Sequence, residues 1–211
     1  MFNHARGLWG YTGTASDGEP LTIQATGLGA ASAAIVTAEL CALGLRTCIR
    51  IGTARSLDAA AGPAPGDVVT VTGALAGDGP SRALGASGTV RPDAALTERL
   101  LQQAGTPALV ATADLTEPDA ESLATWRADG ARACDLQTAT VLQVARTSGV
   151  AAGAVLVVTG ALPGGSTPPL DDEALLAAVT AAAHAAAAAL GLPSRDTPPL
   201  PPPRDDERVS A

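Results

Sequence analysis

The chain contains no lysine, and all 13 of its basic residues are arginine. The absence of lysine excludes Schiff-base chemistry, anchoring of pyridoxal phosphate and the Walker-type phosphate loop, because each needs a lysine amine. Aromatic residues make up only 2% of the 211 residues, and the formal net charge is -8. An acidic chain with so few aromatic side chains is not expected to bind nucleic acid or an anionic membrane.

Cysteine and histidine are also scarce. Cys41, Cys48 and Cys134 are an odd number without C-x-x-C spacing, which predicts buried free thiols in a reducing cytoplasm. His4 and His184 are the only histidines and lie far apart in the sequence, so no metal site is expected. We recognise no signal peptide and no transmembrane run, and we therefore expect a cytoplasmic protein.

Apolar periodicity and Gly/Pro punctuation predict alternating strands and helices. Strands are predicted over 21–25, 47–51, 67–72, 107–112 and 154–159, and helices over 32–43, 95–103, 118–128, 135–147 and 171–190. Residues 74–91 are rich in Gly and Ser and are expected to form a mobile loop. This alternation predicts an α/β fold with a mixed or mostly parallel sheet and helices on both faces.

One domain is expected over residues 1–192. The Pro-rich segment 193–211 has too little apolar surface to pack, and is expected to be an extended or disordered tail. A proline-recognition ligand is the alternative interpretation of this tail.

The strand predicted at 47–51 leads into Arg50-Ile51-Gly52-Thr53, which places a cation, a bare backbone and a hydroxyl at one point. In open α/β sheets, ligands bind at the carboxyl ends of strands. An arginine beside a Gly-Thr turn suits phosphate or another small oxyanion. The alternative is that Arg50 is an ordinary ion-pair partner at a strand end.

Three blocks of sequence together resemble the nucleoside phosphorylase-I family, which includes bacterial purine nucleoside phosphorylases and uridine phosphorylases. They are Arg6-Gly7-Leu8-Trp9-Gly10-Tyr11-Thr12-Gly13-Thr14, Thr26-Gly27-Leu28-Gly29-Ala30-Ala31-Ser32 and Ile49-Arg50-Ile51-Gly52-Thr53. The resemblance implies a three-layer α/β/α sandwich with a twisted mixed β-sheet, assembled into homo-oligomers from dimers to hexamers. Members cleave the N-glycosidic bond of a nucleoside with phosphate, giving a free base and ribose 1-phosphate, and relatives use water.

The resemblance also implies roles for individual residues. The expected phosphate-binding residues are Arg50, Gly52, Thr53 and Arg6, the last reaching the phosphate of a neighbouring subunit. The expected sugar- and base-binding residues are Gly27, Leu28, Gly29, Leu136, Gln137 and Thr159. Inorganic phosphate is the implied co-substrate, and no other cofactor is expected.

Several positions depart from the family pattern. Gln137 stands where the family has a carboxylate that grips the ribose hydroxyls, and Asp135 before it is either a sugar contact or a helix cap. Thr159-Gly160 replaces the Ser-Asp pair that protonates a purine leaving group. Thr116 lies near the position of the stacking aromatic residue. Loss of a general acid costs about 10²–10⁴ in rate, so we expect reduced activity.

Three functions remain open. The first is a nucleoside phosphorylase or nucleosidase. The second is an inactive homologue acting as a ligand-binding or assembly subunit, which Gly160, Gln137 and the absence of the family's Gly-Asp-Pro strand before Arg6 favour. The third is a dinucleotide-binding domain built on Gly27-x-Gly29-x-x-Ser32. That fingerprint is incomplete, because serine replaces its third glycine and no acid ends the next strand.

Overall fold

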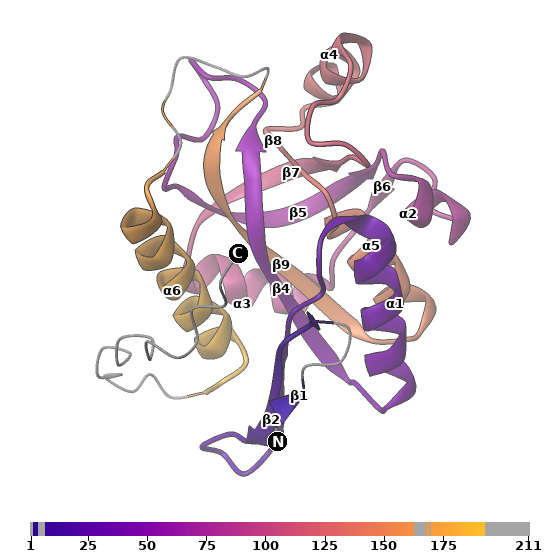
Figure 1. Cartoon of the computed structure of the whole chain (residues 1–211), viewed down its shortest axis with the longest axis vertical. Coiled ribbons are helices and arrows are strands. Elements are labelled where there is room, and N and C mark those ends of the chain that lie inside the picture. The colour runs from indigo at the N-terminus through magenta and orange to yellow at the C-terminus, as the bar shows by residue number, and fades with distance from the viewer. Residues whose placement is uncertain (1, 4–6, 163–167, 169, 193–211) are drawn as a thin grey trace.

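A mixed sheet forms the centre of the computed structural model, which describes residues 2–3, 7–162, 168 and 170–192 (Figure 1). Its strands run in the order β6-β5-β7-β8-β4-β9, and β5 also pairs with β9, so that five strands close on themselves. The strands are β4 (Thr47–Ser56), β5 (Val68–Ala76), β6 (Thr89–Val90), β7 (Thr106–Thr112), β8 (Ala133–Asp135) and β9 (Ala151–Ala161). The β4–β9, β5–β7 and β7–β8 pairs are parallel, and the other pairs are antiparallel.

Helices cover both faces of this sheet, which confirms the predicted mixed α/β class. They are α1 (Gly29–Ala42), α2 (Gly79–Ala83), α3 (Ala94–Gln103), α4 (Ala120–Ala128), α5 (Thr138–Thr147) and α6 (Asp172–Ala189). Strand β9 shows why two layers form, because its side chains alternate between the faces. Leu156 and Val158 pack in one core with Leu142 of α5, whereas Val155 and Val157 pack in another with α3 and α6. None of the described helices is long and apolar enough to cross a bilayer.

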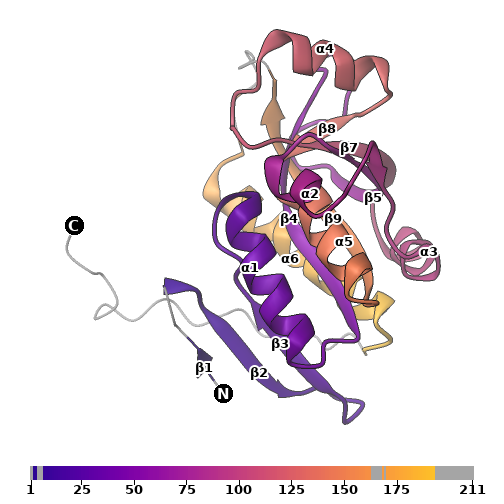
Figure 2. The same ribbon diagram turned by 90° about the vertical axis from the view of Figure 1, so that its right-hand side faces the viewer.

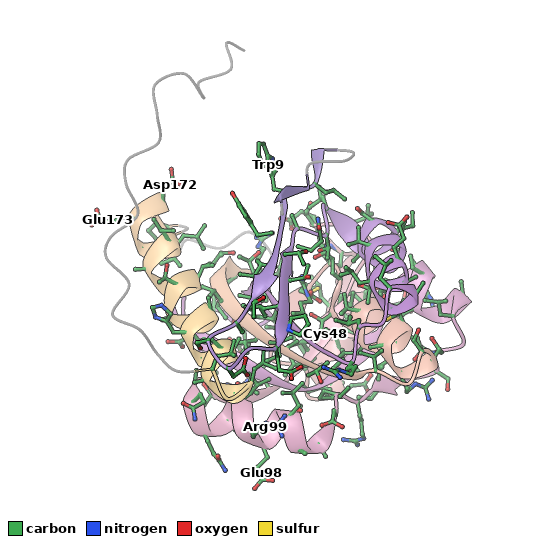
Figure 3. All side chains as sticks on the ribbon, turned by 90° about the horizontal axis from the view of Figure 1, so that it is seen from below. Trp9, Cys48, Glu98, Arg99, Asp172 and Glu173 are labelled. Carbon is green, nitrogen blue, oxygen red and sulfur yellow. The ribbon has the colours of Figure 1, made fainter. Side chains whose placement is uncertain are left out.

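The strands β1 (Phe2–Asn3), β2 (Gly10–Thr14) and β3 (Pro20–Gln24) form a separate antiparallel arm that extends from the body (Figures 1 and 2). Tyr11 pairs directly with Ile23, and Trp9 lies two residues before Tyr11, so these three side chains share one face. They are 61%, 67% and 58% exposed, respectively. Figure 3 shows Trp9 projecting from this arm. The arm therefore presents an apolar face to its surroundings.

Aspartates fix the starts of three helices. Asp93, Asp119 and Asp171 each accept a hydrogen bond from a backbone N–H three residues later, at 2.7–2.8 Å. These bonds satisfy N–H groups that have no partner inside the helix. The predicted starts of α4 and α6 are therefore confirmed to within two residues. The Pro-rich tail expected over 193–211 lies outside the described residues.

The mobile loop predicted over residues 74–91 is wrong. Strand β5 continues to Ala76, α2 follows, and β6 pairs with β5. Asp78 organises this segment, because its buried carboxylate accepts hydrogen bonds from the N–H and hydroxyl of Ser81 and from the hydroxyl of Thr140 in α5. The Gly and Ser content concealed a buried cap, which periodicity alone does not reveal.

Two further boundaries need correction, and both concern the candidate site. The helix predicted from Asp135 begins at Thr138, and Asp135 instead ends the short strand β8. The strand predicted to end near Ile51 continues to Ser56, so Arg50 lies within β4 rather than at its carboxyl end. Strand β8 pairs with β4 only at Arg55 and Ser56. Residues 47–54 of β4 pair with β9 on one side, and on their other side they have no strand neighbour in the described part of the chain.

Candidate active site

Arg50 is held by three side chains that lie 85 to 88 residues away in the sequence. Its Nη2 donates to Oδ2 of Asp135 at 2.8 Å, its Nη1 to Oε1 of Gln137 at 2.6 Å, and its Nε to the hydroxyl of Thr138 at 3.1 Å. The side chain is 10% exposed. Arg50 thus forms an ion pair, as the alternative interpretation predicts, although within β4 and not at a strand end, and its binding of an anion stays a prediction.

Three of the five guanidinium N–H bonds are used in this way, which leaves one on Nη1 and one on Nη2 without a partner among the described residues. A planar guanidinium fixed along one side keeps its remaining donors in a defined direction. The arrangement therefore orients Arg50 and leaves donors for a further acceptor.

Asp135 anchors this cluster from the end of β8. Its fully buried carboxylate accepts from the N–H groups of Gln137 and Thr138, from the Thr138 hydroxyl at 2.7 Å and from the Thr112 hydroxyl at 2.8 Å, in addition to Arg50. Asp135 thereby supplies the first N–H groups of α5 with an acceptor, and its negative charge balances that of Arg50. With so many donors around it, Asp135 holds the site together and accepts from the start of α5, although the N-cap residue of that helix is Gln137.

Gly52 makes room for the Arg50 side chain. A Cβ atom at residue 52 would lie 2.6–2.9 Å from the terminal atoms of the Arg50 guanidinium. Real Cβ atoms do not approach heavy atoms so closely, and residues 50 and 52 share one face of β4 because side chains alternate along a strand. The Arg-x-Gly spacing therefore has a packing cause in this structure.

Gln137 joins Arg50 to the Gly27-Leu28-Gly29 turn before α1. Its Nε2 donates to the carbonyl oxygen of Gly27 at 2.7 Å and to that of Gly29 at 3.2 Å, and the residue is 6% exposed. Both glycines have positive φ angles, 74° and 79°, which other residues adopt only with strain. The structure thus brings the turn, Arg50 and Gln137 into one polar cluster.

Other predicted residues lie outside this cluster. Thr53 is exposed and lies three residues after Arg50 on the same strand, so its side chain leaves the opposite face of β4. Leu28 is 83% exposed, and Leu136 packs beside the core under α4. Arg6 lies outside the described residues.

Thr159 and Gly160 lie at an irregularity in β9. The register between β4 and β9 shifts at Ala54/Arg55, so Thr159 is an additional residue in β9. The Thr159 hydroxyl donates to the carbonyl oxygen of Ala54 at 3.3 Å. A Cβ atom at Gly160 would have no neighbour within 4 Å. Gly160 carries no acid, and among the described residues nothing blocks the position of a Cβ atom, although Gly160 itself is buried.

Arg55 fixes the segment before α4. Its guanidinium forms an ion pair with Glu117 and donates to the carbonyl oxygens of Ala161 at 2.7 Å and Thr116 at 3.4 Å. Thr116, which lies near the position expected for the stacking aromatic residue, therefore contacts Arg55 through its backbone carbonyl oxygen. The contacts of Arg55 thus connect β4 to the segment before α4 and to the end of β9.

Thr112 and Thr138 are site residues that the sequence analysis missed. Thr138 follows Asp135 by three residues, a spacing typical of a cap at the start of a helix, and this was the available signal. Thr112 is placed by β7 and has no such local signal. Within the described residues no group of three His, Cys, Asp or Glu side chains is arranged to hold a metal ion.

The thiols of Cys48 and Cys134 are protonated and poorly reactive near neutral pH. Burial raises the pKa of Cys48 to about 11 and that of Cys134 to about 12, so both are neutral near pH 7. A neutral buried thiol is a poor nucleophile. All three cysteines are free thiols, as expected, but only Cys134 is fully buried, whereas Cys41 and Cys48 are partly exposed.

Comparison with known proteins gives the same family as the sequence blocks. The family model described as the phosphorylase superfamily matches residues 1–192. Guanosine phosphorylase of Halorubrum lacusprofundi is 34% identical over 158 residues, which cover 71% of this chain and 65% of that protein. The DeoD-type purine nucleoside phosphorylase of Streptococcus uberis is 45% identical over 58 residues, 27% of this chain and 24% of that protein. The matches thus span less than two thirds of either relative, and the family match along most of the chain shows that it belongs to the phosphorylase superfamily.

Proposed function

We propose that this protein binds a nucleoside and phosphate at the Arg50–Gln137 cluster and cleaves the N-glycosidic bond at a reduced rate. The observation that carries the proposal is the Nη1–Oε1 contact of Arg50 with Gln137, at 2.6 Å. This contact joins the Gly27–Gly29 turn, β4 and the start of α5 into one site. These are the segments that the family resemblance assigns to phosphate and sugar.

Arg50 is the proposed phosphate ligand. Its two remaining N–H donors suit the oxygens of a phosphate, since arginine binds such anions through paired hydrogen bonds. Asp135 lowers the net charge of this position, because its carboxylate lies 2.8 Å from Nη2. Phosphate must therefore draw on further donors, and Arg6 of a neighbouring subunit is the proposed one. Thr53 is not included, because its side chain leaves the opposite face of β4 from that of Arg50.

In the proposed reaction a phosphate oxygen forms a bond with C1′ of the sugar while the bond from C1′ to the base nitrogen breaks. Arg50 stabilises the phosphate against the oxocarbenium-like sugar. The departing base takes its proton from water, because Gly160 has no side chain that donates one. Loss of such a donor costs about 10²–10⁴ in rate, which is the physical reason for the reduced activity.

The second candidate is an inactive ligand-binding or assembly subunit. Internal hydrogen bonds already use both N–H bonds of Gln137 and three of those of Arg50, which favours this candidate. Turnover distinguishes the two. The enzyme candidate predicts slow but measurable release of base from inosine, 2′-deoxyinosine, adenosine or uridine, at less than about 1 s⁻¹.

We also propose that the protein is a homo-oligomer. The exposed face formed by Trp9, Tyr11 and Ile23 on the arm is apolar, and such a face is covered in most soluble proteins. A second copy of the chain is the proposed partner, and the role that the resemblance implies for Arg6 at a neighbouring site also requires such an assembly.

Calorimetric titration with ribose 1-phosphate tests the binding proposal. Arg50→Lys keeps a positive charge beside Asp135 but loses the planar fork, and we expect it to bind at least tenfold more weakly than the wild type. Arg46→Lys is the matched control, because Arg46 is 80% exposed in an ion pair with Glu19. Equal affinity of the Arg50→Lys variant and the wild type contradicts the assignment of Arg50.

A further inference from the structure

The amide of Gln137 is almost fully used inside the protein. Each N–H bond of Nε2 has its own carbonyl acceptor, Gly27 at 2.7 Å and Gly29 at 3.2 Å. Its Oε1 accepts from Arg50 and, among the described residues, from no other donor. A side-chain carbonyl oxygen accepts two hydrogen bonds. One acceptor position therefore remains, and no donor.

A carboxylate at residue 137 cannot make the same contacts. One of its oxygens would accept from Arg50, but the other would face two carbonyl oxygens at the distances now spanned by hydrogen bonds. Two acceptors in contact at low exposure repel each other, since neither supplies a proton. The glutamine therefore tethers the Gly27-Leu28-Gly29 turn to the site, and a glutamate would release it.

We infer that Gln137 makes this site selective for 2-deoxyribose over ribose. The inference depends on the proposed function, because it assumes that the sugar lies beside Gln137. Ribose carries neighbouring 2- and 3-hydroxyl groups, whereas 2-deoxyribose carries only the 3-hydroxyl. The single acceptor position on Oε1 takes one hydroxyl. A second hydroxyl placed beside the tethered turn has no acceptor on Gln137, and an unpaired buried hydroxyl weakens binding roughly 5- to 150-fold.

Calorimetry with 2-deoxyribose 1-phosphate and ribose 1-phosphate tests the inference. The wild type is expected to bind the deoxy compound at least fivefold more tightly. In Gln137→Glu the preference is expected to vanish or to reverse, because the released carboxylate accepts both hydroxyls. Hydrogen exchange of the amides of residues 26–32 is expected to accelerate at least tenfold in this variant, since the turn loses its two tethers.

Gln143→Glu is a matched control. Gln143 is also a buried amide that donates to a backbone carbonyl, that of Leu84 at 2.7 Å, and accepts from an arginine, Arg146 at 3.1 Å. This variant measures the general cost of placing a carboxylate against a carbonyl away from the site. It is expected to leave both the sugar preference and the exchange of residues 26–32 unchanged.

The outcomes separate the inference from the proposed function. If the wild type binds neither sugar phosphate, the proposed function is wrong and the inference falls with it. If both bind with equal affinity, or if ribose 1-phosphate binds more tightly, only the inference is wrong. Unchanged exchange of residues 26–32 in a folded Gln137→Glu variant also overturns it.

Discussion

Substituting Asp135 by asparagine removes the charge that balances Arg50 while keeping the size of the side chain. Asp135 is fully buried and accepts from Arg50 at 2.8 Å, so the variant leaves a buried guanidinium without its counter-charge. Removing one partner of a buried ion pair costs about 3–5 kcal/mol. The asparagine amide also offers N–H donors to groups that are themselves donors, namely Arg50, Thr112 and Thr138.

We therefore expect the free energy of unfolding to fall by about 3–5 kcal/mol in Asp135→Asn. For a protein of this size, 1 kcal/mol shifts Tm by about 2–4 °C, so Tm is expected to fall by roughly 6–20 °C. Chemical denaturation followed by circular dichroism measures the first quantity and calorimetry the second. Glu19→Gln is the control, because its exposed ion pair with Arg46 contributes at most about 1 kcal/mol.

For the same variant we expect phosphate affinity to rise although stability falls. Since Arg50 loses its internal counter-charge, inorganic phosphate is expected to bind more tightly to Asp135→Asn and to raise its Tm more than that of the wild type. A loss of stability below about 1 kcal/mol would refute the reasoning that the Arg50–Asp135 pair organises the site. An equal response of both proteins to phosphate would refute the proposal that Arg50 is the anion ligand.

Three further predictions concern catalysis, the thiols and assembly. Gly160→Asp is expected to raise the rate of base release from inosine by at least tenfold, because a Cβ atom there meets no neighbour among the described residues and the new side chain supplies an acid. Gly160→Asn is the control, and equal rates contradict the prediction. Burial raises the pKa of Cys48 to about 11 and that of Cys134 to about 12, so the two neutral thiols stabilise the folded state below pH 9, and this contribution is lost as the pH rises from about 9 through 12. Denaturant midpoints at pH 8 and pH 10.5 measure the loss, and a higher midpoint at pH 10.5 contradicts the prediction. Ile23→Asp is expected to reduce the proposed homo-oligomer to smaller species in light scattering without lowering helix content. An unchanged mass argues against the arm as the interface.

The sequence predicted the fold where local signals and packing agree. The long helix α6 begins at a residue capped by Asp171 and ends before Gly191, a glycine with φ 83°, and both signals are local. The segment around Asp78 was missed although Ser81 satisfies its cap locally, because α2 is only five residues long and the burial of the carboxylate against Thr140, 62 residues away, has no local signal. Strand β8 was missed because three residues carry no periodicity of their own, and only their neighbours in β7 and β4 define them as a strand.

In the candidate site, too, some features were predicted from the sequence, whereas features that depend on distant contacts were not. Arg50, Gln137 and the glycine turn were predicted from the resemblance, and the structure brings them together. The partner that fixes Arg50 was not predicted, since nothing in the sequence near residue 50 indicates Asp135. Thr53 was grouped with Arg50 as part of one turn, but the extension of β4 beyond Ile51 places the two side chains on opposite faces. Strand length is a property of the sheet, and local propensity does not determine it.

A crystal structure with ribose 1-phosphate bound tests the central claim most directly. The account predicts that the phosphate oxygens lie within hydrogen-bond distance of the two free Nη donors of Arg50, and that a sugar hydroxyl donates to Oε1 of Gln137. A sugar phosphate bound away from these two side chains, with the Arg50–Asp135 pair and the Gln137 contacts unchanged, would contradict it.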